Sequence, residues 1–184
     1  MIAMPAVFAL VCALQGAATA WERLAVGDLY GALELAEDVA EPLERARLES
    51  EIFYLGRRFE RARSAAIGGL TLEPADPRLA LRALQSSLWL RAPALASADL
   101  VRLAAAVAIG VEPEHRAAWG ALVEQHARDV AALEDRADAL VSAQGRARTL
   151  VVGLGALAAL VLGFGLWGAY TPARDARKAV RAAG

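Results

Sequence analysis

Apolar residues recur every three or four positions along most of the chain, and no segment alternates apolar and polar residues for long. This period is typical of amphipathic helices and not of half-buried strands. Prolines stand where helices can begin, and glycines stand where turns can lie. The fold class predicted is all-α, an array of antiparallel helix hairpins joined by tight turns. The expected helices cover about residues 28–40, 43–56, 58–71, 77–91, 94–109 and 113–145.

Residues 149–170 form an uncharged, apolar segment near the end of the chain. At about 1.5 Å per residue the segment reaches about 33 Å, enough to cross a hydrocarbon core of about 30 Å. Trp167 and Tyr170 stand near its C-terminal end, where amphipathic rings favour the membrane interface. We therefore expect a single transmembrane helix over 149–170, followed by a short basic tail, residues 171–184.

Small residues recur every four positions inside this segment, at Gly155, Ala159 and Gly163. Such a stripe lets two membrane helices pack closely, so it predicts a homodimer through the transmembrane helix. The alternative is that small residues are simply common in this segment.

Residues 1–20 carry no charged side chain and end in the small residues Ala18, Thr19 and Ala20. This pattern predicts a signal peptide that is cleaved before Trp21. The alternative is an uncleaved anchor or a buried first helix. Together with the basic tail, an exported start predicts residues 21–148 on the periplasmic or extracytoplasmic side and the tail in the cytoplasm.

Composition and motifs offer little for chemistry. A formal net charge of −1 argues against bulk affinity for nucleic acid. The single cysteine, Cys12, excludes an intramolecular disulfide, and His115 and His126 lie too far apart on one helix to share a metal. The chain has no phosphate-binding loop and no nucleophile elbow, and the pair Gly68-Gly69 is interpreted as a helix terminus. We therefore predict no enzyme activity, no metal and no cofactor.

The stretch 53–77 resembles a tetratricopeptide repeat, a helix pair with aromatic, small and proline residues in a fixed order. A partial copy precedes it at residues 27–32, and a degenerate copy follows from Pro77, so the resemblance covers about residues 21–110. Two departures are Arg57 at the usual turn position and Ala66 where an aromatic residue is common. The residues that carry the resemblance are Phe53, Phe59, Ala62, Leu70, Leu72 and Pro74.

The resemblance implies a partner-binding groove, because in that family the inner helices of the pairs often bind an extended peptide or a partner's helix. Planar donors and aromatic rings suit such recognition. An alternative for Leu88 and Trp89 is that they pack against the long helix that follows. By the resemblance, the inner face includes Glu44, Leu81 and Leu88, and the groove residues are Arg47, Glu51, Tyr54, Arg78, Gln85 and Trp89.

Residues 111–148 are predicted to form a long capping or stalk helix. Their apolar stripe fits a helix that caps the repeats or a coiled-coil seam, and its shortness favours the cap. A flexible joint is expected at residues 142–145. The stripe consists of Trp119, Val123, His126, Val130, Leu133, Ala137 and Leu140.

These parts together predict a membrane-anchored, non-catalytic scaffold for protein–protein interaction. It would display TPR-like repeats outside the cytoplasm, touch membrane lipid, and bind a protein or peptide partner in a bacterial cell envelope. Two alternatives are a structural spacer or oligomerisation subunit of a membrane complex, and an accessory for transmembrane signalling.

Overall fold

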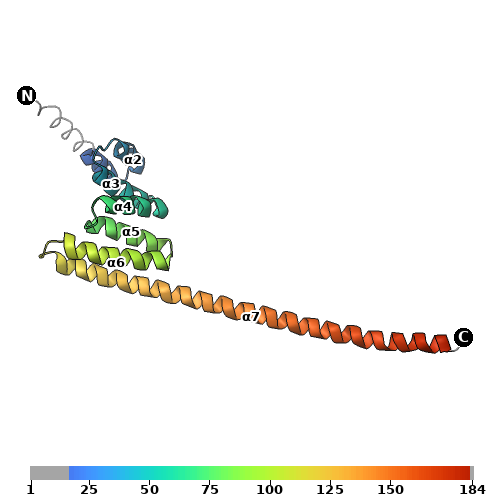
Figure 1. The fold of residues 1–184 in the computed structure, drawn as a ribbon. Helices are drawn as coiled ribbons and strands as arrows, with labels where there is room; N and C mark the ends of the chain where they lie inside the picture. Colours follow the sequence, from blue (N-terminus) through green and yellow to red (C-terminus); the bar gives the residue numbers. More distant parts are fainter. Residues whose placement is uncertain (1–16, 183–184) are drawn as a thin grey trace, which may run out of the picture. The chain divides into compact units, whose positions relative to one another are not determined.

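The computed structural model describes residues 17–182, which contain helices and turns and no strand (Figure 1). The all-α prediction is thus confirmed for this part of the chain. Residues 1–16 of the expected signal peptide, with Cys12, lie outside the described residues. The chain divides into two compact units, residues 1–135 and 136–184. A helical segment at 17–25 is followed by α2 (Leu29–Glu37), α3 (Pro42–Leu55), α4 (Phe59–Leu72), α5 (Pro77–Trp89), α6 (Pro93–Gly110) and α7 (Arg116–Ala182).

Proline and aspartate set the helix starts, largely as the sequence indicates. Helices α3, α5 and α6 each begin at a proline, whose missing N–H costs no hydrogen bond at that position. The Asp76 carboxylate caps α5 by accepting hydrogen bonds from the N–H groups of Arg78 (2.9 Å) and Leu79 (3.1 Å). Pro113 differs, because it lies in a turn and α7 begins only at Arg116.

Three turns within the first unit share one geometry. Gly27, Arg57 and Arg91 have φ values of 83°, 57° and 53°, in the left-handed region. In each turn, the N–H of the next residue bonds a carbonyl five residues back, which is the Schellman pattern for ending a helix. The expected turn residue Gly56 has an ordinary φ of −73°, so an arginine takes the strained position instead. The three bonds are Asp28 to Arg23 (3.0 Å), Arg58 to Phe53 (2.8 Å) and Ala92 to Ser87 (3.2 Å).

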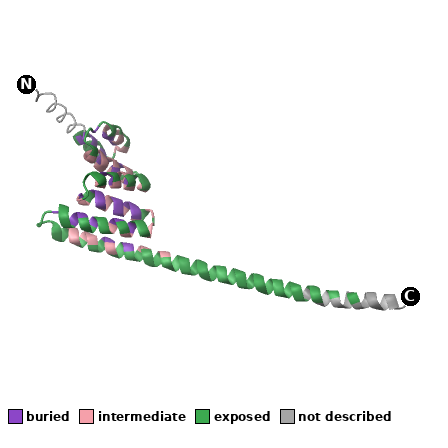
Figure 2. Cartoon of the chain, in the orientation of Figure 1, coloured by how far each residue is buried: buried purple, intermediate pink, exposed green. Residues whose placement is uncertain are grey.

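Small residues after each turn allow the helices to pack closely. Ala32, Ala62 and Ala96 each follow a positive-φ residue by five positions, and all three are fully buried. Consecutive helices from α2 to α6 contact one another, and α3 also contacts α5. Figure 2 shows buried residues on these helices, where they pack against one another. Packed helix pairs with equivalent turns are compatible with a helical repeat.

The helical segment 17–25 is part of this packing. Ala17 and Ala20 are buried with Leu24 in a cluster that includes Leu48 and Ile52 of α3. The last four residues of the expected signal peptide therefore belong to the first hairpin of the unit. This packing is what the alternative of a buried first helix requires, while cleavage before Trp21 remains a prediction.

The start of α7 packs on the cluster built around α5 and α6. Val130 is buried in this cluster, and Trp119, Val123 and Leu133 pack against it, whereas Leu140 is exposed. This arrangement is the one expected of a capping helix. The flexible joint at 142–145 is wrong, because α7 continues through it. The polar residues there fit within the helix. The Ser142 hydroxyl, for example, donates to the backbone carbonyl of Asp138 one turn earlier, at 2.5 Å.

A buried ion cluster joins α4, α5 and α6. Asp99 is fully buried and accepts hydrogen bonds from Arg63 Nε at 2.8 Å and Nη2 at 3.1 Å. Its carboxylate also accepts from the Ser87 hydroxyl at 2.7 Å and from Arg102. One carboxylate thus ties together three helices of the stack.

The glycine pair in α4 provides the first prediction. Both residues lie inside the helix, so the expected terminus is wrong, and they differ in their surroundings. A Cβ on Gly69 would lie 2.6 Å from Leu79 Cδ1 and 2.9 Å from Ala46 Cβ, whereas a Cβ on Gly68 meets nothing within 4 Å. We expect Gly69→Ala to lower the free energy of unfolding by about 1–3 kcal/mol through overpacking.

Gly68→Ala is the matched control, and it should raise the free energy of unfolding by about 0.5–1 kcal/mol, because alanine restricts the unfolded chain and favours the helix. Urea unfolding followed by circular dichroism measures both variants. Equal effects from the two variants would contradict the close approach of α4 to α3 and α5.

Candidate functional site

A hollow of about 140 Å³ lies on the face built by segment 17–25, α3 and α5. These are the first helices of the three hairpins. The resemblance assigned inner-face residues to α3 and α5, and the helical segment 17–25 was not predicted. The residues lining the hollow are Trp21, Glu44, Arg47, Ser50, Glu51, Arg78, Leu79 and Arg82.

Arg47 holds the floor of the hollow in place. Its Nε donates to Asp76 Oδ2 at 2.7 Å, and its Nη1 donates to Glu44 Oε2 at 3.2 Å. Desolvation alone would lower the pKa of Arg47, but the hydrogen bonds and charge attraction from Asp76 and Glu44 outweigh it and raise the pKa. Trp21 Nε1 donates to the other oxygen of Glu44 at 2.8 Å. Arg47 therefore serves as a fixed cation that joins α3 to the start of α5.

Arg82, which the sequence analysis did not select, connects the remaining groove residues. Its guanidinium donates to Glu51 and to Gln85 Oε1 (2.8 Å), and it lies 4.0 Å from the centre of the Tyr54 ring. Arg82 follows Arg78 by one helical turn, so helical spacing on the same face is the signal that would have found it.

Trp89 extends this face with an exposed aromatic group. Its ring stacks on Phe59, with centroids 5.3 Å apart and planes 4° apart, and its Nε1 donates to the Tyr54 hydroxyl at 3.1 Å. Packing of Trp89 on the long helix is wrong, since its side chain meets these two rings and remains exposed. Leu88 does pack in the cluster that contains Val130 of α7.

Arg78 differs from the other predicted groove residues. Within the described residues, its side chain is exposed and has no hydrogen-bond or ion-pair partner, although its N–H bonds Asp76. The structure thus brings Glu51, Tyr54, Gln85 and Trp89 into contacts connected through Arg82 and Tyr54, while Arg47 bonds Asp76 and Glu44 separately and Arg78 lies at the rim of the hollow. The arrangement offers one unpaired cation beside paired charges and exposed rings, which suits non-covalent recognition.

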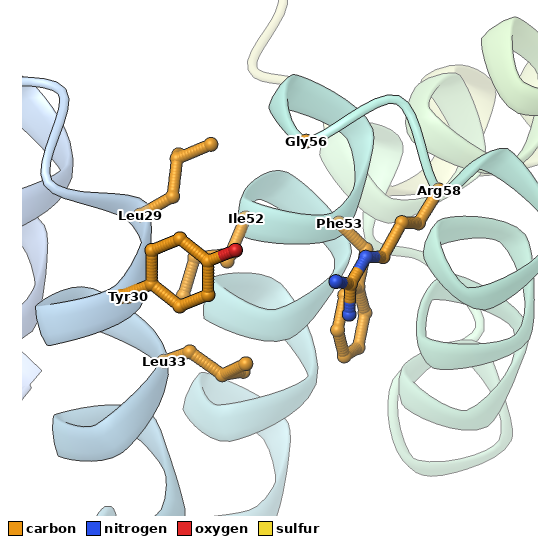
Figure 3. A pocket seen from close by; sticks show the side chains of 7 residues that line it. All are labelled: Leu29, Tyr30, Leu33, Ile52, Phe53, Gly56 and Arg58. Carbon is orange, nitrogen blue, oxygen red and sulfur yellow. The ribbon is translucent and has the colours of Figure 1, made fainter.

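A second hollow, of about 150 Å³, opens between α2 and the end of α3 (Figure 3). Leu29, Tyr30 and Leu33 of α2 face Ile52, and the Arg58 side chain lies beside Phe53. The sequence analysis did not select this mainly apolar hollow. Tyr30 at its mouth is largely exposed.

The predicted transmembrane stripe lies on α7 in the second unit. Ala159 and Gly163 line an open hollow of about 390 Å³ with Leu160, Phe164 and Trp167. A Cβ added to Gly155 or Gly163 would meet nothing within 4 Å. The face is therefore open along the part of the helix where close pairing was expected.

Two described helices are long and apolar enough to cross a membrane, namely α6 and the part of α7 up to Phe164.

Among the described residues, no group of three or more His, Cys, Asp or Glu side chains is arranged to hold a metal ion. Comparisons with protein-family models, with curated proteins and with solved structures give no match for this chain.

Proposed function

We propose that this protein is a membrane-anchored, non-catalytic scaffold that presents a TPR-like helical-repeat domain to a protein or peptide partner outside the cytoplasm. The observation that carries the proposal is the face on α3 and α5 beside a hollow, where Arg82 contacts Glu51, Tyr54 and Gln85 and Tyr54 bonds Trp89. Asp76 and Glu44 hold Arg47 on the same face. Its arginine and aromatic side chains are the types that dominate protein interfaces. Rigid helix pairs would hold them in place before a partner arrives.

The three equivalent turns and the buried alanines support the TPR-like part of the proposal. In such an array the first helices of successive hairpins lie side by side. The contact between α3 and α5 agrees with this arrangement. The free guanidinium of Arg78 is suited to a carboxylate or a backbone carbonyl of the partner.

A single membrane span, residues 149–170, is the anchor in this proposal. Its described side chains are exposed and apolar, as a lipid-facing helix requires. Helix α6 passes the same test of length and composition, but it contributes Leu103, Ala106 and Val107 to the core and carries the paired Asp99. We therefore assign α6 to the folded module. The anchor would raise the local concentration of the module near membrane partners.

A spacer or oligomerisation subunit is the second candidate, and the open stripe at Gly155, Ala159 and Gly163 favours it. Close pairing of two such helices would dimerise the protein without use of the inner face. The two candidates predict different effects of changing the inner face. A change at Arg78 should disturb the complex with a different protein that a scaffold forms, and it should leave a homodimer through residues 149–170 unchanged.

Arg78→Glu tests the scaffold, because this exposed side chain has no partner within the described residues and its replacement should leave folding intact. We expect recovery of a crosslinked partner to fall at least about tenfold, since charge reversal removes one ion pair and adds a repulsion. Crosslinking in native membranes, followed by quantitative mass spectrometry of the full-length protein, measures the loss.

Arg128→Glu is the matched control, since Arg128 is an exposed arginine of α7 away from the inner face. A partner that is lost only with Arg78→Glu supports the scaffold. Equal recovery with both variants, together with crosslinks only between copies of this chain, would favour the spacer.

A further inference from the structure

The three positive-φ turns lie along one edge of the first unit. Leu29 and Gly56 line the same hollow, which places the first turn beside the second. The stacked rings of Phe59 and Trp89 place the second turn beside the third. We call this the turn edge, defined as residues 26–30, 53–61 and 89–97.

Exposed apolar side chains gather at the turn edge. Tyr30 is 79% exposed and Trp89 is 63% exposed, in positions where neither ring reaches the core. Five of the nine exposed large apolar residues among residues 17–135 lie here, and the others are Trp21, Leu72, Val101 and Ile109. The five are Val26, Tyr30, Leu55, Trp89 and Leu95.

Charge is divided between this edge and the opposite one. Within the turn edge, Glu60 is outnumbered by arginines, and Asp28 is paired with Arg23 at 3.2 Å. The opposite edge, residues 37–41, 72–76 and 109–116, carries mainly carboxylates, and we call it the acidic edge. The arginines of the turn edge are Arg57, Arg58, Arg61 and Arg91, and the exposed carboxylates of the acidic edge are Glu37, Asp38, Glu41, Glu73, Glu112 and Glu114.

The chain leaves the first unit beside the turn edge. The Ser97 hydroxyl donates a hydrogen bond to Glu134, one residue before the unit ends at Asp135. Glu134 and Asp135 reduce the positive charge at that corner. Residues 136–148 then lead to the segment 149–170, and they span about 20 Å as a helix or about 45 Å if extended. The turn edge is thus within reach of the bilayer that holds this segment.

We propose that the turn edge docks on the anionic surface of the bilayer in which residues 149–170 are anchored, an inference that rests on the anchor in the proposed function. Arginines are drawn to anionic headgroups within a screening length of about 10 Å, and tryptophan and tyrosine favour the interface. The acidic edge is repelled from the same surface, so the charge division sets which edge faces the lipid. Docking needs residues 136–148, which link the first unit to the membrane segment, to tilt toward the bilayer surface. The hollow lined by Arg47, Arg78 and Arg82 stays available to a partner, whereas Tyr54 and Trp89 belong to both surfaces and lie where the partner meets the lipid.

Lipid proximity of the two edges tests this proposal in the full-length protein. Leu55→Cys on the turn edge and Leu72→Cys on the acidic edge have similar exposure, 50% and 56%, and each is labelled with bimane in a Cys12→Ser background. The protein is placed in nanodiscs that contain phosphatidylglycerol and a nitroxide-labelled lipid. We expect quenching at position 55 to exceed quenching at position 72 at least about twofold, and to fall when Arg57, Arg58 and Arg91 are changed to Glu or when phosphatidylglycerol is omitted.

The outcomes separate the edge from the anchor. Equal or absent quenching at the two positions, in protein that enters the nanodiscs, would overturn the proposal and leave the anchor intact. Protein that fails to enter the nanodiscs would overturn the anchor and the docking together. If bimane at position 55 is not quenched by lipid, and this position crosslinks to another protein in native membranes, the turn edge is a protein interface instead.

Discussion

Asp99→Ala is expected to lower the free energy of unfolding by about 3–5 kcal/mol, because it leaves the largely buried guanidinium of Arg63 without its anion. Asp99 is fully buried, and the Arg63 side chain that pairs with it is only 21% exposed. After the change, Arg63 would keep the Ser87 hydroxyl beside it but no carboxylate, whereas Arg102 is 48% exposed and remains solvated. The loss is a large share of the about 5–15 kcal/mol that stabilises a typical domain.

The position of the cluster explains why the effect should spread through the first unit. Arg63 lies on α4, Ser87 on α5 and Asp99 on α6, so one carboxylate joins three consecutive layers of the stack. Urea unfolding of the full-length protein in detergent, followed by circular dichroism, should show the midpoint lowered by about 2 M or more. The helical signal of the second unit should persist beyond that transition.

Asp135→Ala is the matched control, since this aspartate is exposed and has no partner in the described part of the chain. Its effect should remain within about 0.5 kcal/mol. The double variant Arg63→Met with Asp99→Leu should recover part of the loss, because no charge of that pair is then left buried alone. A cost below about 1 kcal/mol for Asp99→Ala would contradict a buried ion cluster.

Local features of the chain predicted most of the helices. Proline starts at residues 42, 77 and 93, and the cap at Asp76, depend on neighbours within one helical turn, so the sequence displays them directly. The glycine pair in α4 was misjudged because Gly68-Gly69 has the composition of a terminus, although the expected helix 58–71 nearly matches Phe59–Leu72. Only the approach of Leu79 and Ala46 explains the glycine at position 69, and sequence spacing does not reveal that approach.

Contacts between distant residues were the hardest to predict. Arg63 and Asp99 are 36 positions apart, and neither carries a motif, so only the packing of α4 and α6 against α5 brings them together. Arg82 was missed for a similar reason, since its partners Glu51 and Tyr54 belong to the previous hairpin. The inner-face residues were predicted in advance because a repeat fixes which side of each first helix faces inward.

Termination of the chain after Arg148 is expected to move nearly all of the protein out of the membrane fraction. Residues 149–170 contain no charge, and each leucine or valine within them favours insertion by about 0.3–0.6 kcal/mol. Loss of the whole segment therefore removes the anchor, while the first unit keeps its core. Carbonate extraction of membranes, with immunoblotting for the first unit, measures the distribution.

Termination after Ala173 is the control, because it removes the basic residues of the tail and keeps the apolar segment. This variant should stay in the membrane, although its orientation would lose the support of the tail charges. If the chain that ends at Arg148 nevertheless stays in the membrane, another segment must anchor it. The mature N-terminus, read from the same samples, identifies that segment. A start at Met1 would mean that the N-terminal segment also anchors the chain and that cleavage before Trp21 is wrong. A start at Trp21 would mean that α6 spans the bilayer, against the ion pair that Asp99 forms in the core.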